Sequence, residues 1–280
     1  MTLELRNPVM VASGCGGTGR ELAAFADLAV LGGFVTRSIS VGARPGGPQP
    51  RVLETPSGLV HAVGLQNPGL DQFLALELPW LAQQRVAVFV SVVGRSLGEY
   101  AELARRIGLA PGVAGIEVNL SPPDVAGDGV FDVREPFHAA SVVAAVRREL
   151  PRGLPVLAKL RTDLLRVAES ARSVLEAGAD AVVVGNALPA AMPDGRPAGL
   201  SGLAIRPLAL RCVAEVLAAD PAAPVIACGG IADTADARAA LDLGAVGVQV
   251  GAALFRDPTT AARLAAALAH DPAPIEEETR

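Results

Sequence analysis

Short apolar segments recur along the chain, and longer segments with helical spacing separate them. The apolar segments read as strands, and they are Pro8–Ser13, Phe34–Ser40, Val86–Val93, Gly115–Leu120, Pro155–Leu160, Ala181–Gly185, Pro224–Ala227 and Val246–Val250. Helical spacing predicts helices between them, over Leu97–Ile107, Pro136–Leu150, Leu164–Ala177, Ile205–Ala219, Thr234–Leu243 and Pro258–His270. Strands that are apolar on both faces and alternate with helices are typical of a parallel sheet covered on both sides. Eight such units predict an α/β fold, a (β/α)8 TIM barrel.

One segment breaks this alternation. From Gly42 to Gly69 the chain is rich in proline and glycine and is too long for an ordinary connection. We expect this insert to fold over the C-terminal mouth of the barrel, within a single domain spanning residues 1–269. Residues 270–280 are acidic and are expected to form a C-terminal tail. A doubly wound open sheet is the alternative, but Arg37 and Ser38 stand where that fold carries an acidic residue.

Composition and charge exclude several classes of function. The 24 Lys and Arg residues are outnumbered by 29 Asp and Glu, and aromatic residues make up 3% of the 280. A nucleic-acid binder needs a basic surface and stacking side chains, so we expect this protein to bind no nucleic acid. The three cysteines lie far apart without metal-ligand spacing, which predicts no metal site and a reducing, cytoplasmic location. No apolar run is long enough for a membrane span, and the N-terminal residues lack a basic segment followed by an apolar one, so we expect neither a membrane span nor a signal peptide.

Polar residues and glycines gather where the predicted strands end. They are Ser13-Gly14, Thr36-Arg37-Ser38, Asn119, Lys159, Asn186, Gly229-Gly230 and Gly251-Ala252. Barrel enzymes place their reacting groups at these ends, and the loops after strands seven and eight commonly bind phosphate. Lys159 follows an apolar strand and needs a polar partner, for which a cofactor heteroatom is suited. A phosphate-binding aldolase with Lys159 as a Schiff-base lysine is another interpretation.

Several motifs appear in an order that resembles the class 1 dihydroorotate dehydrogenases. They are Asn7-Pro8-Val9-Met10 with Ala12-Ser13-Gly14, Thr36-Arg37-Ser38-Ile39, Pro50-Arg51 with Glu54-Thr55-Pro56, Gly64-Leu65-Gln66-Asn67-Pro68-Gly69, Glu117-Val118-Asn119-Leu120-Ser121, Gly199-Leu200-Ser201-Gly202 and Val250-Gly251. The resemblance implies a barrel with FMN at its mouth, a homodimer, and oxidation of dihydroorotate to orotate in pyrimidine synthesis. In some relatives an electron-transfer partner subunit takes part as well.

The resemblance also implies which residues hold FMN. Ala12, Ser13 and Gly14 would lie along the isoalloxazine, while Ser38, Asn119 and Lys159 would bond its polar edge. The ribityl phosphate would lie at Ser201, Gly202, Gly229, Gly230, Gly251 and Ala252. Two residues depart from the family pattern on this side: Arg37 replaces a lysine, and Ala252 replaces a threonine. Because Arg37 keeps the positive charge, we expect FMN binding to be retained.

The substrate side departs further from the family pattern. By resemblance the substrate would contact Arg37, His61, Gly64, Leu65, Asn119, Asp124, Asn186 and Ala187. Pro122 stands where the family has the cysteine that removes a proton, and proline can neither accept nor donate one. His61 and Asp124 replace asparagines, and Ala187 replaces a hydroxyl residue. Loss of a general base costs about 10²- to 10⁴-fold in rate, so we expect dihydroorotate oxidation to be impaired.

These observations give one hypothesis and one alternative. The hypothesis is an FMN-dependent oxidoreductase that acts on a CH–CH bond of a dihydroorotate-like or other small molecule, with His61 or Asp124 as proton donor or acceptor. His61 is suited to this because its ordinary pKa lies near neutrality. Ser121 is expected to point away from the site, since side chains alternate along a strand. The alternative is a non-catalytic flavin-binding paralogue or partner subunit that has kept the barrel.

Overall fold

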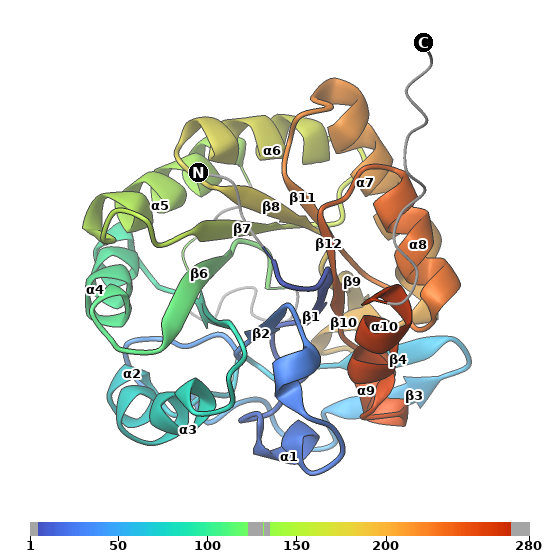
Figure 1. Ribbon diagram of the computed structural model, residues 1–280, viewed down its shortest axis with the longest axis horizontal. Helices are drawn as coiled ribbons and strands as arrows, with labels where there is room; N and C mark the ends of the chain where they lie inside the picture. Colours follow the sequence, from blue (N-terminus) through green and yellow to red (C-terminus); the bar gives the residue numbers. More distant parts are fainter. Residues whose placement is uncertain (1–4, 123–130, 132–134, 270–280) are drawn as a thin grey trace.

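Eight parallel strands close into a barrel at the centre of the molecule (Figure 1). The computed structural model describes residues 5–122, 131 and 135–269. The barrel strands are β1 (Val9–Val11), β2 (Gly33–Val35), β5 (Val88–Val92), β6 (Val113–Asn119), β7 (Val156–Leu160), β8 (Ala181–Val184), β11 (Val225–Cys228) and β12 (Gly247–Val250). Their order around the barrel is β1-β12-β11-β8-β7-β6-β5-β2. The predicted (β/α)8 barrel is therefore confirmed, and each of its strands overlaps a predicted one.

Helices surround the barrel, as Figure 1 shows for α4 to α8. The α-helices are α1 (Arg20–Ala23), α2 (Leu70–Gln72), α3 (Leu78–Ala82), α4 (Leu97–Gly108), α5 (Pro136–Glu149), α6 (Val167–Glu176), α7 (Arg206–Ala219), α8 (Thr234–Asp242), α9 (Ala253–Arg256) and α10 (Thr260–Ala269). Two 3₁₀ turns, η1 (Leu28–Val30) and η3 (Leu203–Ile205), and a π-helical turn, η2 (Phe73–Glu77), complete the set. Within the described residues no helix is long and apolar enough to cross a membrane.

Local side-chain bonds explain where two of these helices begin. Asp233 accepts a hydrogen bond from the Asp236 amide at 2.9 Å, and Asp236 bonds back to the Asp233 amide, which forms a capping box at the start of α8. The predicted helix at Leu164 instead begins at Val167. The reason is a turn in which Asp163 accepts the Leu165 amide at 3.2 Å, and Leu165 remains 95% exposed.

Two apolar layers stabilise the barrel. Side chains on the outer face of the strands pack against the helices, and they include Val90, Val118 and Val184. A smaller cluster fills the barrel interior, and it comprises Met10, Ala12, Val35, Phe89, Leu157, Ala181, Val183, Ile226 and Cys228. Because both faces of each strand are buried, the strands are apolar almost throughout. The polar exceptions inside the barrel therefore mark positions with a role other than packing.

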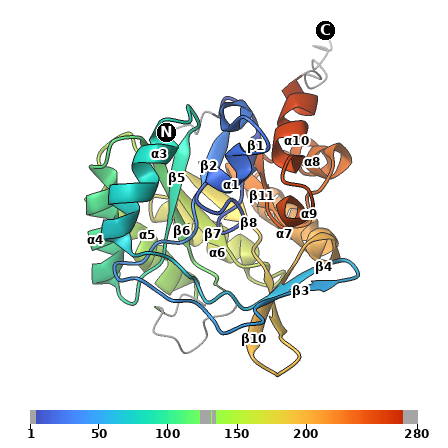
Figure 2. The same ribbon diagram turned by 90° about the horizontal axis from the view of Figure 1, so that it is seen from below.

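A second, antiparallel sheet lies at one end of the barrel, where Figure 2 shows β3, β4 and β10 together. Its order is β3 (Val52–Thr55), β4 (Gly58–His61), β10 (Pro197–Ser201) and β9 (Leu188–Ala191). The insert thus forms the hairpin β3–β4, which pairs with a second hairpin, β9–β10, that the sequence pattern did not reveal. Arg196 joins the two by donating to the carbonyls of Pro48 at 3.0 Å and Pro50 at 2.8 Å. The expected acidic tail lies outside the described residues.

Candidate active site

A cavity of about 1010 Å³ opens at the carboxyl ends of the barrel strands, under the second sheet. It is lined by nearly all residues that the sequence assigned to a site, namely Ala12, Ser13, Gly14, Arg37, Ser38, His61, Leu65, Asn119, Lys159, Asn186, Ala187, Ser201, Gly202, Gly229, Gly230, Gly251 and Ala252. Barrel closure brings these residues together from seven strand ends and from β4 and β10. Their grouping agrees with the expected site, and their individual roles stay predictions.

Three residues of the expected site are not placed in this cavity. Gly64, with φ 68°, forms a turn against Gly47 and does not line the cavity. Pro122, just beyond the end of β6, does not line it either. Asp124 lies outside the described residues, so its proposed contact with substrate stays a prediction.

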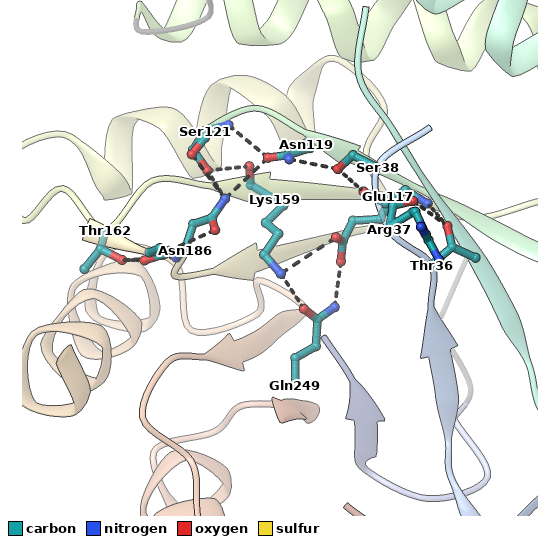
Figure 3. Close-up of polar contacts among 12 residues, drawn as sticks. Thr36, Arg37, Ser38, Glu117, Asn119, Ser121, Lys159, Thr162, Asn186 and Gln249 are labelled. Carbon is teal, nitrogen blue, oxygen red and sulfur yellow. Dashed lines mark hydrogen bonds and ion pairs between the residues drawn. The ribbon is translucent and has the colours of Figure 1, made fainter. Parts of the chain in front are cut away.

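A chain of polar side chains crosses the strand ends on one side of the cavity (Figure 3). The Ser38 hydroxyl lies 3.0 Å from that of Ser91 and accepts a hydrogen bond from Asn119 at 3.0 Å. Asn186 donates to Asn119 Oδ1 at 3.3 Å and to the Ser121 hydroxyl at 2.9 Å. Ser121 is buried and does not line the cavity, as predicted. Because each amide is fixed by its neighbour, Asn119 and Asn186 face the cavity in set orientations.

Lys159 carries a buried positive charge into the same cavity. Its Nζ donates to Gln249 Oε1 at 2.7 Å and lies 3.7 Å from Glu117 Oε1 (Figure 3). Burial lowers the pKa of Lys159, but interactions with Cys228, Glu117 and Cys15 outweigh burial, so the pKa of Lys159 is raised. A Schiff-base lysine needs a lowered pKa to act as a neutral amine, so the aldolase interpretation is not favoured. A protonated lysine is instead suited to bond an electron-rich heteroatom.

Arg37 brings a second cation to the cavity from the end of β2. Its Nε lies 4.0 Å from Glu77, which ends the π-helical turn η2. Burial raises the pKa of Glu77, while Arg37 opposes this shift. The pair holds the guanidinium at the cavity wall, where it is available to an anionic group.

Glycine loops form the opposite part of the cavity. Gly230 has φ 73°, and a Cβ there would lie 2.4 Å from the Cβ of Arg206 in α7, so only glycine fits. The Asp236 carboxylate accepts the Ala232 amide at 3.0 Å and pairs with Arg206, which fixes the loop after β11 on α7 and α8. Gly14, with φ 79°, lines the cavity and has no atom within 4 Å of where its Cβ would be.

These two parts of the cavity fit the two ends of FMN. The amide, hydroxyl and ammonium groups of Asn119, Ser38 and Lys159 match the hydrogen-bonding edge of a flavin ring. The glycine loops leave room for a phosphate to approach backbone amides closely. Open space above Gly14 leaves a flat face free for a planar ring. The residues present therefore fit the cofactor that the sequence predicted.

Sequence reasoning missed several residues that the structure brings to this cavity. Glu117 and Gln249 contact Lys159 from inside the barrel, and Cys15 and Cys228 line the cavity and interact with Lys159. Period-2 alternation was the available signal, because Glu117 shares a strand face with Asn119, and Gln249 shares one with Gly251. Arg256, Asp257, Thr260 and Arg263 also line the cavity from α9 and α10. Nothing in the local sequence pattern indicates that these two helices reach the site.

Comparison with known proteins agrees with this geometry. The family model described as dihydroorotate dehydrogenase matches residues 1–271. The catalytic subunit of dihydroorotate dehydrogenase B (NAD(+)) of Anoxybacillus flavithermus is 42% identical over 265 residues, which cover 91% of this chain and 84% of that protein. The protein of the same name from Pelobacter propionicus is 42% identical over 272 residues, covering 94% and 88%. FMN is the cofactor of this family, so that prediction is confirmed at family level. The chain belongs to the dihydroorotate dehydrogenase family, in its class 1 branch.

Proposed function

We propose that the protein is an FMN-dependent oxidoreductase that exchanges hydride with a CH–CH bond of a dihydroorotate-like small molecule in an altered substrate pocket. The observation that carries the proposal is the cavity at the barrel mouth, where Lys159 and the Asn119 amide face glycine loops. Its volume of about 1010 Å³ accommodates a cofactor together with a small substrate. Membership of the family supports the reaction class, acting on a CH–CH group.

The residues of the cavity divide between cofactor and substrate. Ser38, Asn119 and Lys159 would hold the polar edge of FMN, and the loops at Gly229-Gly230 and Gly251-Ala252 would hold its phosphate. FMN held by these residues would supply the acceptor for a hydride from carbon. Arg37, held by Glu77, offers a positive charge that favours an anionic substrate. Asn186 is oriented by Ser121 and Asn119 and presents its amide to the same space.

Removal of hydride from one carbon requires removal of a proton from its neighbour, and this step distinguishes the chain from the family pattern. Pro122 stands at the position that the resemblance assigns to the base. His61, on β4, lines the cavity and can take a proton near neutral pH. We infer that His61 is the proton acceptor, with Asp124 as the other residue that fits this role. The hydroxyl lost at Ala187 changes the same pocket, which supports a substrate that differs from dihydroorotate.

Anaerobic flavin spectra of the FMN-loaded protein test this proposal. Dithionite is expected to bleach the flavin fully. Dihydroorotate is expected to bleach it at least 10²-fold more slowly than in a Pro122→Cys variant, which places a thiol at the position that the resemblance assigns to the base. His61→Ala is expected to slow bleaching by the preferred substrate by about 10²-fold, whereas Gln66→Ala, on the same cavity wall, is expected to leave it unchanged.

Two results would overturn parts of this proposal. Fast bleaching of the wild-type flavin by dihydroorotate would mean that the Pro122 position needs no base and that the pocket is not altered. A flavin that dithionite reduces, but that candidate substrates reduce neither in the wild type nor in Pro122→Cys, would favour a non-catalytic flavin-binding paralogue. The proline at position 122 is the observation that favours this second candidate.

We also propose an electron-transfer partner subunit, because the relatives named above are catalytic subunits of an NAD(+) enzyme. Three apolar side chains that line the cavity are also exposed, Val52 at 44%, Leu203 at 46% and Phe255 at 59%. Exposed apolar groups beside a cofactor site are suited to contact another protein. The reduced protein alone is then expected not to be reoxidised by NAD+, and rapid reoxidation by NAD+ alone would contradict a separate partner. The expected homodimer stays a prediction.

A further inference from the structure

Three buried polar side chains meet inside the barrel (Figure 3). Glu117 comes from β6, Lys159 from the neighbouring β7, and Gln249 from β12 on the other side of the barrel. Gln249 accepts the Lys159 ammonium at 2.7 Å and donates to Glu117 Oε2 at 2.6 Å. An amide can do both at once, whereas a carboxylate or an ammonium cannot. Gln249 therefore bridges the ammonium and the carboxylate, which also form an ion pair at 3.7 Å.

These three residues differ in what they present to the cavity. Lys159 lines it, while Glu117 and Gln249 are fully buried behind Lys159 and do not. Glu117 Oε1 lies 3.7 Å from Lys159 Nζ and has no hydrogen-bond partner among the described residues. The ammonium at the cavity wall is thus held between Gln249 and Glu117. Gln249 and Cys228 are hydrogen-bond partners of the ammonium, which leaves one of its three N–H groups for a ligand.

Among the described residues, Glu117 is the carboxylate that pairs with the Lys159 ammonium, at 3.7 Å. The titratable groups facing Lys159 are Glu117 on β6, Cys228 on β11 and Cys15 after β1. Burial raises the pKa of Cys15 to about 12 and also raises that of Cys228, so both are neutral thiols at pH 7. Without Glu117, the ammonium would be buried with no opposing charge, and it would lose its proton more readily.

We propose that Glu117 and Gln249 are positioning residues that keep Lys159 protonated and directed at the polar edge of bound FMN, so that Glu117 sets the reduction potential of the flavin. The proposal rests on the proposed function, because it requires FMN in this cavity. Two-electron reduction of flavin with uptake of one proton from solvent leaves a negative charge on the ring. An ammonium at the ring edge stabilises that charge, and a neutral amine does not.

The midpoint potential of bound FMN, measured against pH above neutrality with dithionite as reductant, tests the proposal. In the wild type, one proton accompanies two electrons, which corresponds to a tenfold change in equilibrium constant, or about 30 mV, per pH unit. In Glu117→Gln, Lys159 is neutral beside oxidised FMN and takes up a second proton on reduction. The slope is then expected to double, to about 60 mV per pH unit.

Matched variants separate this explanation from a loss of structure. Lys159→Met is expected to lower the potential while keeping the single-proton slope, because no group is left to titrate. The double variant Glu117→Gln with Lys159→Met is expected to behave like Lys159→Met, and it leaves no unpaired buried charge that would prevent folding. Gln249→Met is expected to keep the single-proton slope and to lower the potential, because the ammonium moves toward Glu117 and away from the cavity.

Each outcome decides the proposal. If the wild type takes up FMN and the midpoint potential has the same pH dependence in Glu117→Gln as in the wild type, this inference is overturned and the proposed function stays intact. Failure of the wild type to take up FMN would overturn both. If Glu117→Gln does not fold, the Gln249→Met result decides, and an unchanged potential in that variant would refute the positioning role.

Discussion

Asn67 ties the insert to the barrel, and its removal should weaken the fold by a predictable amount. The side chain is buried at the turn after β4. Its Nδ2 donates to the Ser40 hydroxyl and to the Leu65 carbonyl, each at 2.9 Å, and its Oδ1 accepts the Gly69 amide at 2.9 Å. Two further contacts with Ser40, at 3.3 Å, are weaker. The same residue thereby holds Leu65, which has φ 54° and lines the cavity.

The magnitude follows from the three good hydrogen bonds that Asn67→Ala removes. At about 1 kcal/mol each, the free energy of unfolding falls by about 3 kcal/mol. The entropy of unfolding is about 2.1 cal/mol/K per residue. For 280 residues this gives about 0.6 kcal/mol/K. The melting temperature should therefore fall by about 5 °C.

Thermal unfolding of Asn67→Ala beside Gln66→Ala provides the measurement. Gln66 is exposed and accepts a hydrogen bond from the Arg51 side chain, so its replacement should change stability by at most about 0.5 kcal/mol. Asn67→Asp keeps the acceptor for Gly69 but loses both donors and places a buried carboxylate against the Leu65 carbonyl, so it should melt no higher than Asn67→Ala. Equal melting temperatures for Asn67→Ala and Gln66→Ala would refute the assignment of these hydrogen bonds.

Three further predictions concern other parts of the structure. Asp236→Ala removes the acceptor of the Ala232 and Asp233 amides, so the free energy of unfolding measured in urea should fall by about 2 kcal/mol. Asp242 is exposed on the same helix, so Asp242→Ala should leave that free energy unchanged, and equal losses in the two variants would contradict the prediction. Hydrogen bonds from Thr259 and the Arg263 cation lower the pKa of Asp257 to about 2, so the wild type should melt above Asp257→Asn at neutral pH. This difference in melting temperature should shrink as pH falls from about 4 toward 2, and a constant difference would refute the lowered pKa. Burial raises the pKa of the Cys15 thiol to about 12. Iodoacetamide should therefore label Cys15 about 10³-fold more slowly in the native FMN-free protein than in urea, measured by mass spectrometry. Equal labelling rates would show that the native thiol is accessible and ionised.

The barrel strands, most of the surrounding helices and the polar strand ends could be predicted from the sequence, because local periodicity and capping specify them. Continuous apolar segments predicted strands such as β7 and β8, and the capping residue Asp233 predicted the start of α8. Ser38, Asn119, Lys159 and Asn186 were found because a parallel barrel collects its strand ends at one mouth. The start of α6 was misplaced because the Asp163 turn competes with helix formation, and periodicity does not register that competition.

Tertiary structure alone decided two features. The sheet β3-β4-β10-β9 pairs segments that lie more than 100 residues apart, so no local pattern could indicate that Gly199 pairs with His61. Likewise Gln249 reaches Lys159 across 90 positions and Glu117 across 132. Each of these three residues reads as an isolated polar interruption in an apolar strand. Closure of the barrel brings them together. Because a buried polar group without a hydrogen bond is costly, each of them is stabilised by a partner on another strand.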